Sequence, residues 1–230
     1  MRRLTGVSVV LFDLDGTLLD TAGELVAAVN RAVAPLTGGV PLDFDLVKSW
    51  IGNGIVVLFR SALGHLGFEN DDLENQFDLR WGDFLSAYHA LCGTRCAPYP
   101  GMDSCLQHLR RAGCRLGVVT NKDSVFTRKL LLAHELAGQF EVVICGDTLA
   151  QKKPAPQTLW AALQQLHVEP GQGLFVGDSI TDLKTGAAAG VRTWAVRHGY
   201  HHGDFDRPLP AHLRPDRFVD GFPEIAALLT

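Results

Sequence analysis

The 230-residue sequence lacks any pattern of paired cysteines. Its five cysteines are an odd number, and no two of them form a Cys-x-x-Cys motif. These features argue against a disulfide framework and favour a reducing compartment, so we expect a cytoplasmic protein. His89, Cys92 and Cys96 lack the tight paired spacing that is usual in zinc sites, and we expect no metal there.

Long apolar runs and a strong net charge are also missing. No stretch of roughly 18 apolar residues is present, so no transmembrane helix is expected. Arg2 and Arg3 precede only a short apolar run that ends at Asp13, which is not the pattern of a signal peptide. The formal net charge of -4 predicts neither a nucleic-acid partner nor a membrane partner. The apolar fraction of 47% suffices for one large domain, or for one domain carrying a smaller one.

The apolar run at residues 8–12 ends abruptly in two acids, Asp13 and Asp15, followed by Gly16. Such a run predicts a strand that is buried on both faces, as in the middle of a parallel sheet. Ligands in open α/β sheets bind beyond the carboxyl ends of these strands. The spacing of the two acids predicts that both point the same way. Because buried carboxylates are costly without a cation or hydrogen-bond donors, we expect such partners nearby.

Residues 20–92 show helix-like patterns and no convincing strand. Thr21 and Glu24 form a capping-box signature, which predicts the start of a helix. Further helices are predicted at residues 46–50, 55–66 and 71–91. The Pro- and Gly-containing segment 93–101 is typical of a linker. The sequence therefore predicts a helical cap domain at residues 20–92, inserted into a core formed by residues 1–19 and 93–230.

Strand and helix patterns alternate after this linker. Strands are predicted at residues 115–121, 141–145, 173–179, 191–196 and 217–219, with helices between and after them. Such alternation indicates a parallel sheet with helices on both faces. The predicted fold is thus α/β, with a Rossmann-like parallel sheet core and an inserted all-helical cap domain.

Polar residues end or follow four of the predicted strands. They are Asp13 with Asp15, Thr120 with Asn121, Lys153 in the segment after strand 141–145, and Asp178 with Asp182. Each group alone has a structural explanation, namely a turn, a strand end, a solvated lysine or a helix cap. Because all strands of a parallel sheet end at one edge, we expect the four groups to converge in one site.

The residue types in this set are suited to phosphoryl chemistry. Asp13 and Asp178 supply the hard oxygen ligands that Mg²⁺ prefers. A carboxylate held in this way, such as Asp13, can attack a phosphoryl group, and Asp15 can act as general acid and base. Phosphoryl oxygens could be bound by Thr120, by Lys153 and by backbone N–H groups near Gly16 and Asn121.

The segment Asp13-Leu14-Asp15-Gly16-Thr17 resembles motif I of the haloacid dehalogenase-like superfamily. Thr120, Lys153 and residues 177–182 are similar to its motifs II, III and IV, so the resemblance covers essentially the whole chain. It implies that Asp13 is a nucleophile forming an aspartyl-phosphate and that Asp15 is the acid and base. The presence of Asp15 excludes the dehalogenase branch, where this acid is absent.

The same resemblance implies a set of metal ligands. Asp13, the backbone carbonyl of Asp15 and Asp178 would hold Mg²⁺. Asp182 would orient either a metal-bound water or Lys153.

Residues 50–54, 120–122, 153–156 and 198–200 resemble phosphoglycolate phosphatases in particular. This implies a small phosphorylated metabolite as substrate, with 2-phosphoglycolate favoured. The cap loop of Gly52, Asn53 and Gly54 is expected to close over the substrate, although a plain turn between helices is the alternative. Many relatives have Gly-Tyr-Asn where this chain has Tyr200 followed by His201 and His202, so the role of the two histidines stays open.

Other functions are also compatible with this sequence. The chain could be a sugar-phosphate phosphatase, for example one acting on N-acetylmuramate 6-phosphate, or a pyrophosphatase or a phosphomutase. A non-catalytic binding module is disfavoured because the five residues Asp13, Asp15, Thr120, Lys153 and Asp178 are all present. A monomer or a small homo-oligomer is expected.

Overall fold

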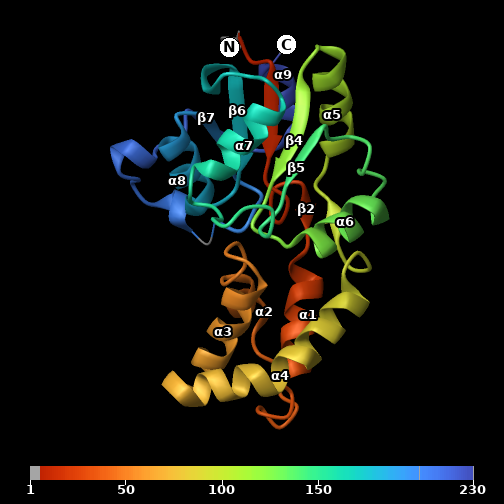
Figure 1. Ribbon diagram of the computed structural model, residues 1–230, viewed down its shortest axis with the longest axis vertical. Coiled ribbons are helices and arrows are strands. Elements are labelled where there is room, and N and C mark those ends of the chain that lie inside the picture. Colours follow the sequence, from red (N-terminus) through yellow and green to blue (C-terminus); the bar gives the residue numbers. More distant parts are fainter. Residues whose placement is uncertain (1–5, 202, 230) are drawn as a thin grey trace.

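The structure, a computed structural model, describes residues 6–201 and 203–229. A six-stranded parallel sheet forms one end of the molecule (Figure 1). Its strand order is β5-β4-β1-β6-β7-β8. The strands are β1 (Val9–Phe12), β4 (Arg115–Val119), β5 (Val142–Ile144), β6 (Gly173–Gly177), β7 (Arg192–Val196) and β8 (Arg217–Val219). The predicted central, fully buried first strand is confirmed, since every residue of β1 is buried.

Helices cover both faces of this sheet. They are α5 (Met102–Arg111), α6 (Ser124–Ala133), α7 (Gln157–Gln165), α8 (Ile180–Ala189) and α9 (Phe222–Leu228). Val10 and Phe12 of β1 belong to the apolar cluster that includes α5, α6 and α9. Val9 and Leu11 belong to the cluster that includes α7. Because side chains alternate along a strand, these two clusters lie on opposite faces, which confirms the predicted α/β architecture.

Four helices lie together at the other end of the molecule (Figure 1). They are α1 (Ala22–Val33), α2 (Phe44–Lys48), α3 (Ile55–His65) and α4 (Asn70–Leu91). Aromatic rings join α3 to α4, with ring centroids of Phe59 and Phe84 5.0 Å apart. Helix α2 begins before the predicted residue 46 because the Asp43 carboxylate caps it, accepting from the Leu46 N–H at 2.9 Å. None of the helices in the described ranges is both long and apolar enough to span a membrane.

The predicted capping box at Thr21 and Glu24 is wrong. The Thr21 side chain makes no capping hydrogen bond, and its hydroxyl donates to Asp15 Oδ1 at 2.6 Å instead. The Glu24 carboxylate accepts from the Gly93 N–H at 2.9 Å. Both side chains therefore serve partners outside helix α1, and a local signature cannot reveal partners that are brought near only by folding. A capping box does form at the start of α8, between Ser179 and Asp182.

The two chain segments that connect α1–α4 to the large sheet pair with each other. Strands β2 (Leu19–Asp20) and β3 (Ala97–Pro98) form a two-stranded antiparallel sheet. The sequence predicts only a linker near residues 93–101, because two-residue strands carry too little periodicity to be recognised. The pairing holds both connections together at the base of the helical insert.

Candidate active site

The carboxyl ends of β1, β4 and β6 meet at the centre of one sheet edge, as expected for parallel neighbours. Backbone pairing continues beyond two of them, since Asp13 N–H donates to Val176 O and Thr120 N–H to Ile144 O, both at 2.9 Å. The structure thus brings Asp13, Thr120 and Asp178 together. These residues lie far apart in the sequence.

Strand β1 ends at Phe12, before either acid of the first motif. The alternation of a strand therefore does not orient Asp13 and Asp15, contrary to the prediction. A turn through Gly16 orients the two acids instead, and both of them line the same pocket. The Gly16 N–H, expected near the phosphoryl group, donates to Leu19 O at 2.9 Å within this turn.

Gly16 also has to be a glycine for two structural reasons. Its φ is +81°, which disfavours residues with a Cβ atom. A Cβ atom at this position would lie 2.3 Å from Asp178 Oδ2. The close approach of this turn to Asp178 thus depends on the absent side chain.

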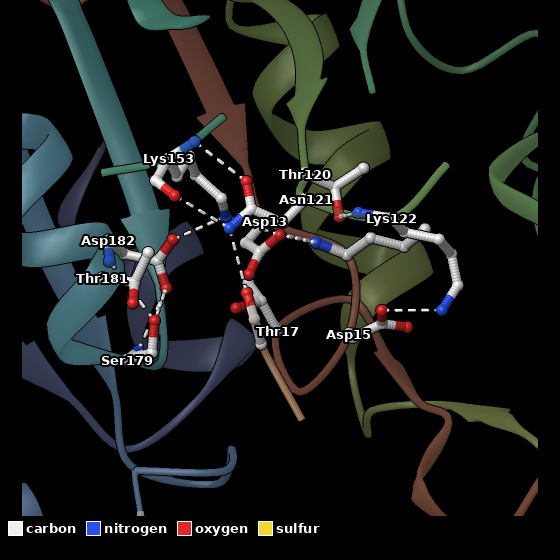
Figure 2. Close-up of polar contacts among 12 residues, drawn as sticks. Asp13, Asp15, Thr17, Thr120, Asn121, Lys122, Lys153, Ser179, Thr181 and Asp182 are labelled. Carbon is white, nitrogen blue, oxygen red and sulfur yellow. Dashed lines mark hydrogen bonds and ion pairs between the residues drawn. The ribbon is translucent and has the colours of Figure 1, made fainter. Parts of the chain in front are cut away.

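Lys153 lies at the centre of the acidic cluster (Figure 2). Its Nζ is 2.8 Å from Asp13 Oδ1 and 2.7 Å from Asp182 Oδ1. The side chain is buried. Burial by itself lowers the pKa of Lys153, but the charges of the two carboxylates outweigh it and raise the pKa overall. Lys153 is therefore a permanent ammonium facing Asp13.

Asp178 and Asp182 also accept hydrogen bonds from neighbouring residues. Asp178 accepts from the Thr17 hydroxyl at 2.8 Å and from the Tyr200 N–H at 2.6 Å. Asp182 accepts from the Ser179 hydroxyl at 2.6 Å, at the start of α8. Of the two partners expected for Asp182, the structure shows Lys153.

The acidic cluster has the composition of a cation site. Carboxylate oxygens of Asp13, Asp178 and Asp182 lie within 4.8 Å of one another, and all three residues are buried. Burial raises the pKa of Asp13 to about 7, although Lys153 opposes this shift. Burial and the neighbouring acids raise the pKa of Asp178. Since three carboxyl groups face one ammonium and all donors are oxygens, a hard divalent cation such as Mg²⁺ fits this cluster.

Asp15 points away from this cluster and toward Lys122 (Figure 2). Its Oδ2 is 2.7 Å from the Lys122 Nζ, and its Oδ1 accepts from the Thr21 hydroxyl at 2.6 Å. Lys122 is not among the site residues predicted from the sequence. A lysine after a strand is usually solvated, but this side chain is only 1% exposed.

Asn121 connects the site to the loop of the helical insert. Its side-chain amide donates to the backbone carbonyls of Lys153 and Gly52, at 3.0 and 3.1 Å. Its Oδ1 accepts from the Lys153 N–H at 2.9 Å. The Asn121 side chain thus positions Lys153 and contacts the insert at the same time.

The loop of Gly52, Asn53 and Gly54 rests against the core. Gly52 and Gly54 line the pocket, together with the apolar residues Leu25, Ile51, Ile55 and Leu58 from the insert. Asn53 accepts a hydrogen bond from the Thr181 hydroxyl at 3.3 Å. The free volume of this pocket is about 20 Å³, enough for about one water molecule.

The remaining candidates lie outside the pocket. His201 Nε2 is 3.1 Å from Arg197 O, and its ring stacks on Phe205, whereas His202 lies outside the described residues. Cys96 Sγ is 2.9 Å from His134 Nε2. In the described part of the chain, the three aspartates are the one cluster with the composition of a metal site.

Comparisons with known proteins identify the family of this chain. Residues 10–196 match the family described as haloacid dehalogenase-like hydrolase. A phosphoglycolate phosphatase of Pseudomonas putida is 38% identical over 224 residues, which is 96% of this chain and 78% of that protein. An N-acetylmuramic acid 6-phosphate phosphatase of Pseudomonas aeruginosa is 35% identical over 220 residues, 96% of this chain and 93% of that protein.

Solved structures share the fold as well. The crystal structure of a predicted phosphoglycolate phosphatase from Haemophilus somnus superposes with a TM-score of 0.88 at 28% identity. The superposition covers 99% of this chain and 100% of that one. The family match covers all four strand-end groups of the candidate site. The chain therefore belongs to the haloacid dehalogenase-like hydrolase family.

Proposed function

We propose that this protein is a Mg²⁺-dependent phosphatase of small phosphorylated metabolites, with 2-phosphoglycolate as the favoured substrate. The observation that carries the proposal is the contact of Lys153 with Asp13, inside a buried cluster of three aspartates. A carboxylate beside a fixed ammonium is suited to attack a phosphoryl group whose charge that ammonium stabilises. The similarity to the phosphoglycolate phosphatase of P. putida supports the substrate.

The reaction has two steps. In the first, an Asp13 carboxylate oxygen attacks phosphorus, the bond to the ester oxygen breaks, and Asp15 gives its proton to that oxygen. In the second, water attacks the aspartyl-phosphate, Asp15 takes a proton from the water, and the bond between Asp13 and phosphorus breaks. Inorganic phosphate leaves, and both acids return to their starting states.

Asp13, Asp178 and the backbone carbonyl of Asp15 would hold Mg²⁺. When bound, the cation neutralises the carboxylates and the phosphoryl oxygens so that one anion can approach another. Asp182 holds Lys153 at 2.7 Å, which keeps the ammonium directed at Asp13. Thr120 and the backbone N–H of Asn121 would bind the remaining phosphoryl oxygens.

Residues 20–92 would act as a cap domain that opens to admit the substrate. The free volume of the pocket, about 20 Å³, is smaller than a phosphate ester, so binding would require the insert to move. The paired strands β2 and β3 are the connection about which it would turn. Hydrogen exchange at residues 50–54 should slow when a phosphate analogue is bound. Identical exchange in both states would contradict a moving cap.

A phosphate-release assay tests the function itself. The panel holds 2-phosphoglycolate, N-acetylmuramate 6-phosphate, hexose phosphates and pyrophosphate, each with Mg²⁺ and with EDTA. We expect the highest kcat/KM for 2-phosphoglycolate, and no turnover with EDTA or in the folded Asp13→Asn variant. Full activity in that variant would remove Asp13 from its role as nucleophile.

A second substrate has its own support. The relative named for N-acetylmuramic acid 6-phosphate is covered over 93% of its length by this chain. A higher kcat/KM for that sugar phosphate in the same panel would replace 2-phosphoglycolate as the substrate. The proposed chemistry would be unchanged.

A further inference from the structure

Lys122 is a buried cation that the two proposed steps do not use. Its side chain is 1% exposed, and its Nζ lies 2.7 Å from Asp15 Oδ2 and 5.3 Å from the centre of the Tyr88 ring. Burying an ammonium is costly even when it is paired, and a hydrophobic replacement is often as stable. Its presence at this position therefore calls for a function other than stability.

The pocket has a charged end and an apolar end. Asp13 and Thr120 line it where the phosphoryl group would bind. Leu25, Ile51, Ile55 and Leu58 line it on the side of the helical insert, where the rest of the substrate would lie. Of the described residues that line the pocket, Lys122 alone carries a positive charge. An anionic group on that part of the substrate thus has one cation to bind.

The contact with Asp15 sets how far this anionic group can be from the phosphate. As general acid, Asp15 has to lie within hydrogen-bond reach of the ester oxygen. Lys122 lies 2.7 Å from the same carboxylate, so in a bound substrate its ammonium would face the atoms that follow the ester oxygen by one or two bonds. A lysine ammonium has three donors and can bind Asp15 and a second carboxylate together.

We propose that Lys122 determines substrate specificity by binding a carboxylate attached to the carbon that bears the phosphate ester. The inference rests on the proposed phosphatase function and narrows its substrates to phosphate esters of small 2-hydroxy acids, of which 2-phosphoglycolate is the smallest. By holding the substrate carboxylate and Asp15 together, Lys122 also aligns the ester oxygen with its proton donor. Sugar phosphates, which carry no carboxylate at this position, would lack the contact.

The test compares two substrates that differ only in the carboxylate. The ratio of kcat/KM for 2-phosphoglycolate to kcat/KM for ethyl phosphate is measured in the wild type, Lys122→Met and Lys122→Arg. Loss of the Asp15 contact should lower both rates together, so the ratio isolates recognition of the carboxylate. We expect the ratio to fall at least tenfold in Lys122→Met, mainly through a higher KM for 2-phosphoglycolate, and to recover in part in Lys122→Arg.

Lys152→Met serves as the matched control. Lys152 lies near the loop of Gly52 and Gly54, but its side chain is 41% exposed and pairs with Asp123 at 3.4 Å. The control should keep the wild-type ratio. An unchanged ratio in folded Lys122→Met would overturn the proposal for Lys122 while leaving the phosphatase function intact.

A binding measurement separates the two proposals further. Calorimetric titration of 2-phosphoglycolate and ethyl phosphate into the wild type and Lys122→Met requires no turnover. We expect the wild type to bind 2-phosphoglycolate more tightly than ethyl phosphate, and Lys122→Met to lose that preference. If no ester were hydrolysed but this pattern held, the proposed function would fail and the role of Lys122 in recognition would stand. Equal binding of both esters by the wild type would overturn that role.

Discussion

The phenolic oxygen of Tyr200 lies 2.6 Å from Asp20 Oδ1 and donates a hydrogen bond to it. The same oxygen accepts from the backbone N–H groups of Thr21 and Ala22, at 2.7 and 2.9 Å. The backbone N–H of Tyr200 meanwhile donates to Asp178 at 2.6 Å. One buried residue thus joins a proposed metal ligand to the segment that leads into the helical insert.

Tyr200→Phe should destabilise the protein without weakening the metal site. The variant leaves the buried Thr21 N–H without its acceptor and Asp20 without the hydroxyl donor, which costs about 1–3 kcal/mol, whereas the Ala22 N–H keeps Asp20 Oδ1 as an acceptor at 3.3 Å. Urea denaturation measures this loss. The backbone hydrogen bond to Asp178 persists, so calorimetry should find unchanged Mg²⁺ affinity. Unaltered stability, or a tenfold weaker Mg²⁺ affinity, would contradict this account.

Gly16→Ala should impair the site far more than Gly113→Ala. The φ angles are +81° and +86°, so an added Cβ imposes similar backbone strain, about 1–2 kcal/mol, at both positions. At Gly113 no atom lies within 4 Å of the new carbon, whereas at Gly16 it would meet Asp178 Oδ2 at 2.3 Å. We expect Gly113→Ala to keep its kcat/KM and Gly16→Ala to lose at least tenfold. Equal kcat/KM values in the two variants would count against crowding at Asp178.

Glu24 should make the protein less stable as the pH rises. Its side chain is buried, and burial raises its pKa above the ordinary value of 4.5. Between 4.5 and the raised pKa, the folded protein binds more protons than the unfolded chain, so this group's contribution to stability declines through that window.

Replacing Glu24 by Gln tests this dependence. Glu24→Gln keeps an oxygen for the Gly93 N–H but cannot ionise. The free energy of unfolding of the variant minus that of the wild type should therefore be larger at pH 8 than at pH 5. Urea denaturation at both pH values measures the difference. If the variant and the wild type differed in free energy of unfolding by the same amount at pH 5 and pH 8, Glu24 would not titrate in this range.

Mg²⁺ should raise the melting temperature of the wild type and not that of Asp178→Asn. A ligand at 100 times its dissociation constant stabilises the folded state by about 2.7 kcal/mol. Asp147→Asn is the control, since Asp147 is an exposed acid hydrogen-bonded to Ser124, outside the cluster. It should keep the full Mg²⁺ response, as followed by calorimetry. A full response in Asp178→Asn would place the cation elsewhere.

Patterns within short segments were sufficient to predict much of the fold and the grouping of the site residues. The uninterrupted apolar run before Asp13 predicts a central buried strand, because only such a strand avoids water on both faces. The alternation of strands and helices then places the carboxyl ends of the strands at one edge. For that reason Asp13, Thr120, Lys153 and Asp178 could be grouped, and their types suggested phosphoryl chemistry before any distance was known.

Contacts between distant segments decided the rest. Thr21 and Glu24 have the sequence of a helix cap, yet their partners are Asp15 and Gly93. A local signature is overruled when folding brings a stronger partner within reach. The pairing of the two-residue strands β2 and β3 also could not be predicted, because neither segment has enough residues to specify a strand alone.

The sequence by itself determined the sheet, the helical insert and the acids at the strand ends, because periodicity and residue type are local properties. Only the tertiary structure decided which of these charges meet. It directed Asp15 to Lys122 and Lys153 to Asp13 and Asp182, and it enclosed Lys122 in the pocket. Coulomb energies and burial depend on distances across the fold, which the order of residues along the chain does not contain.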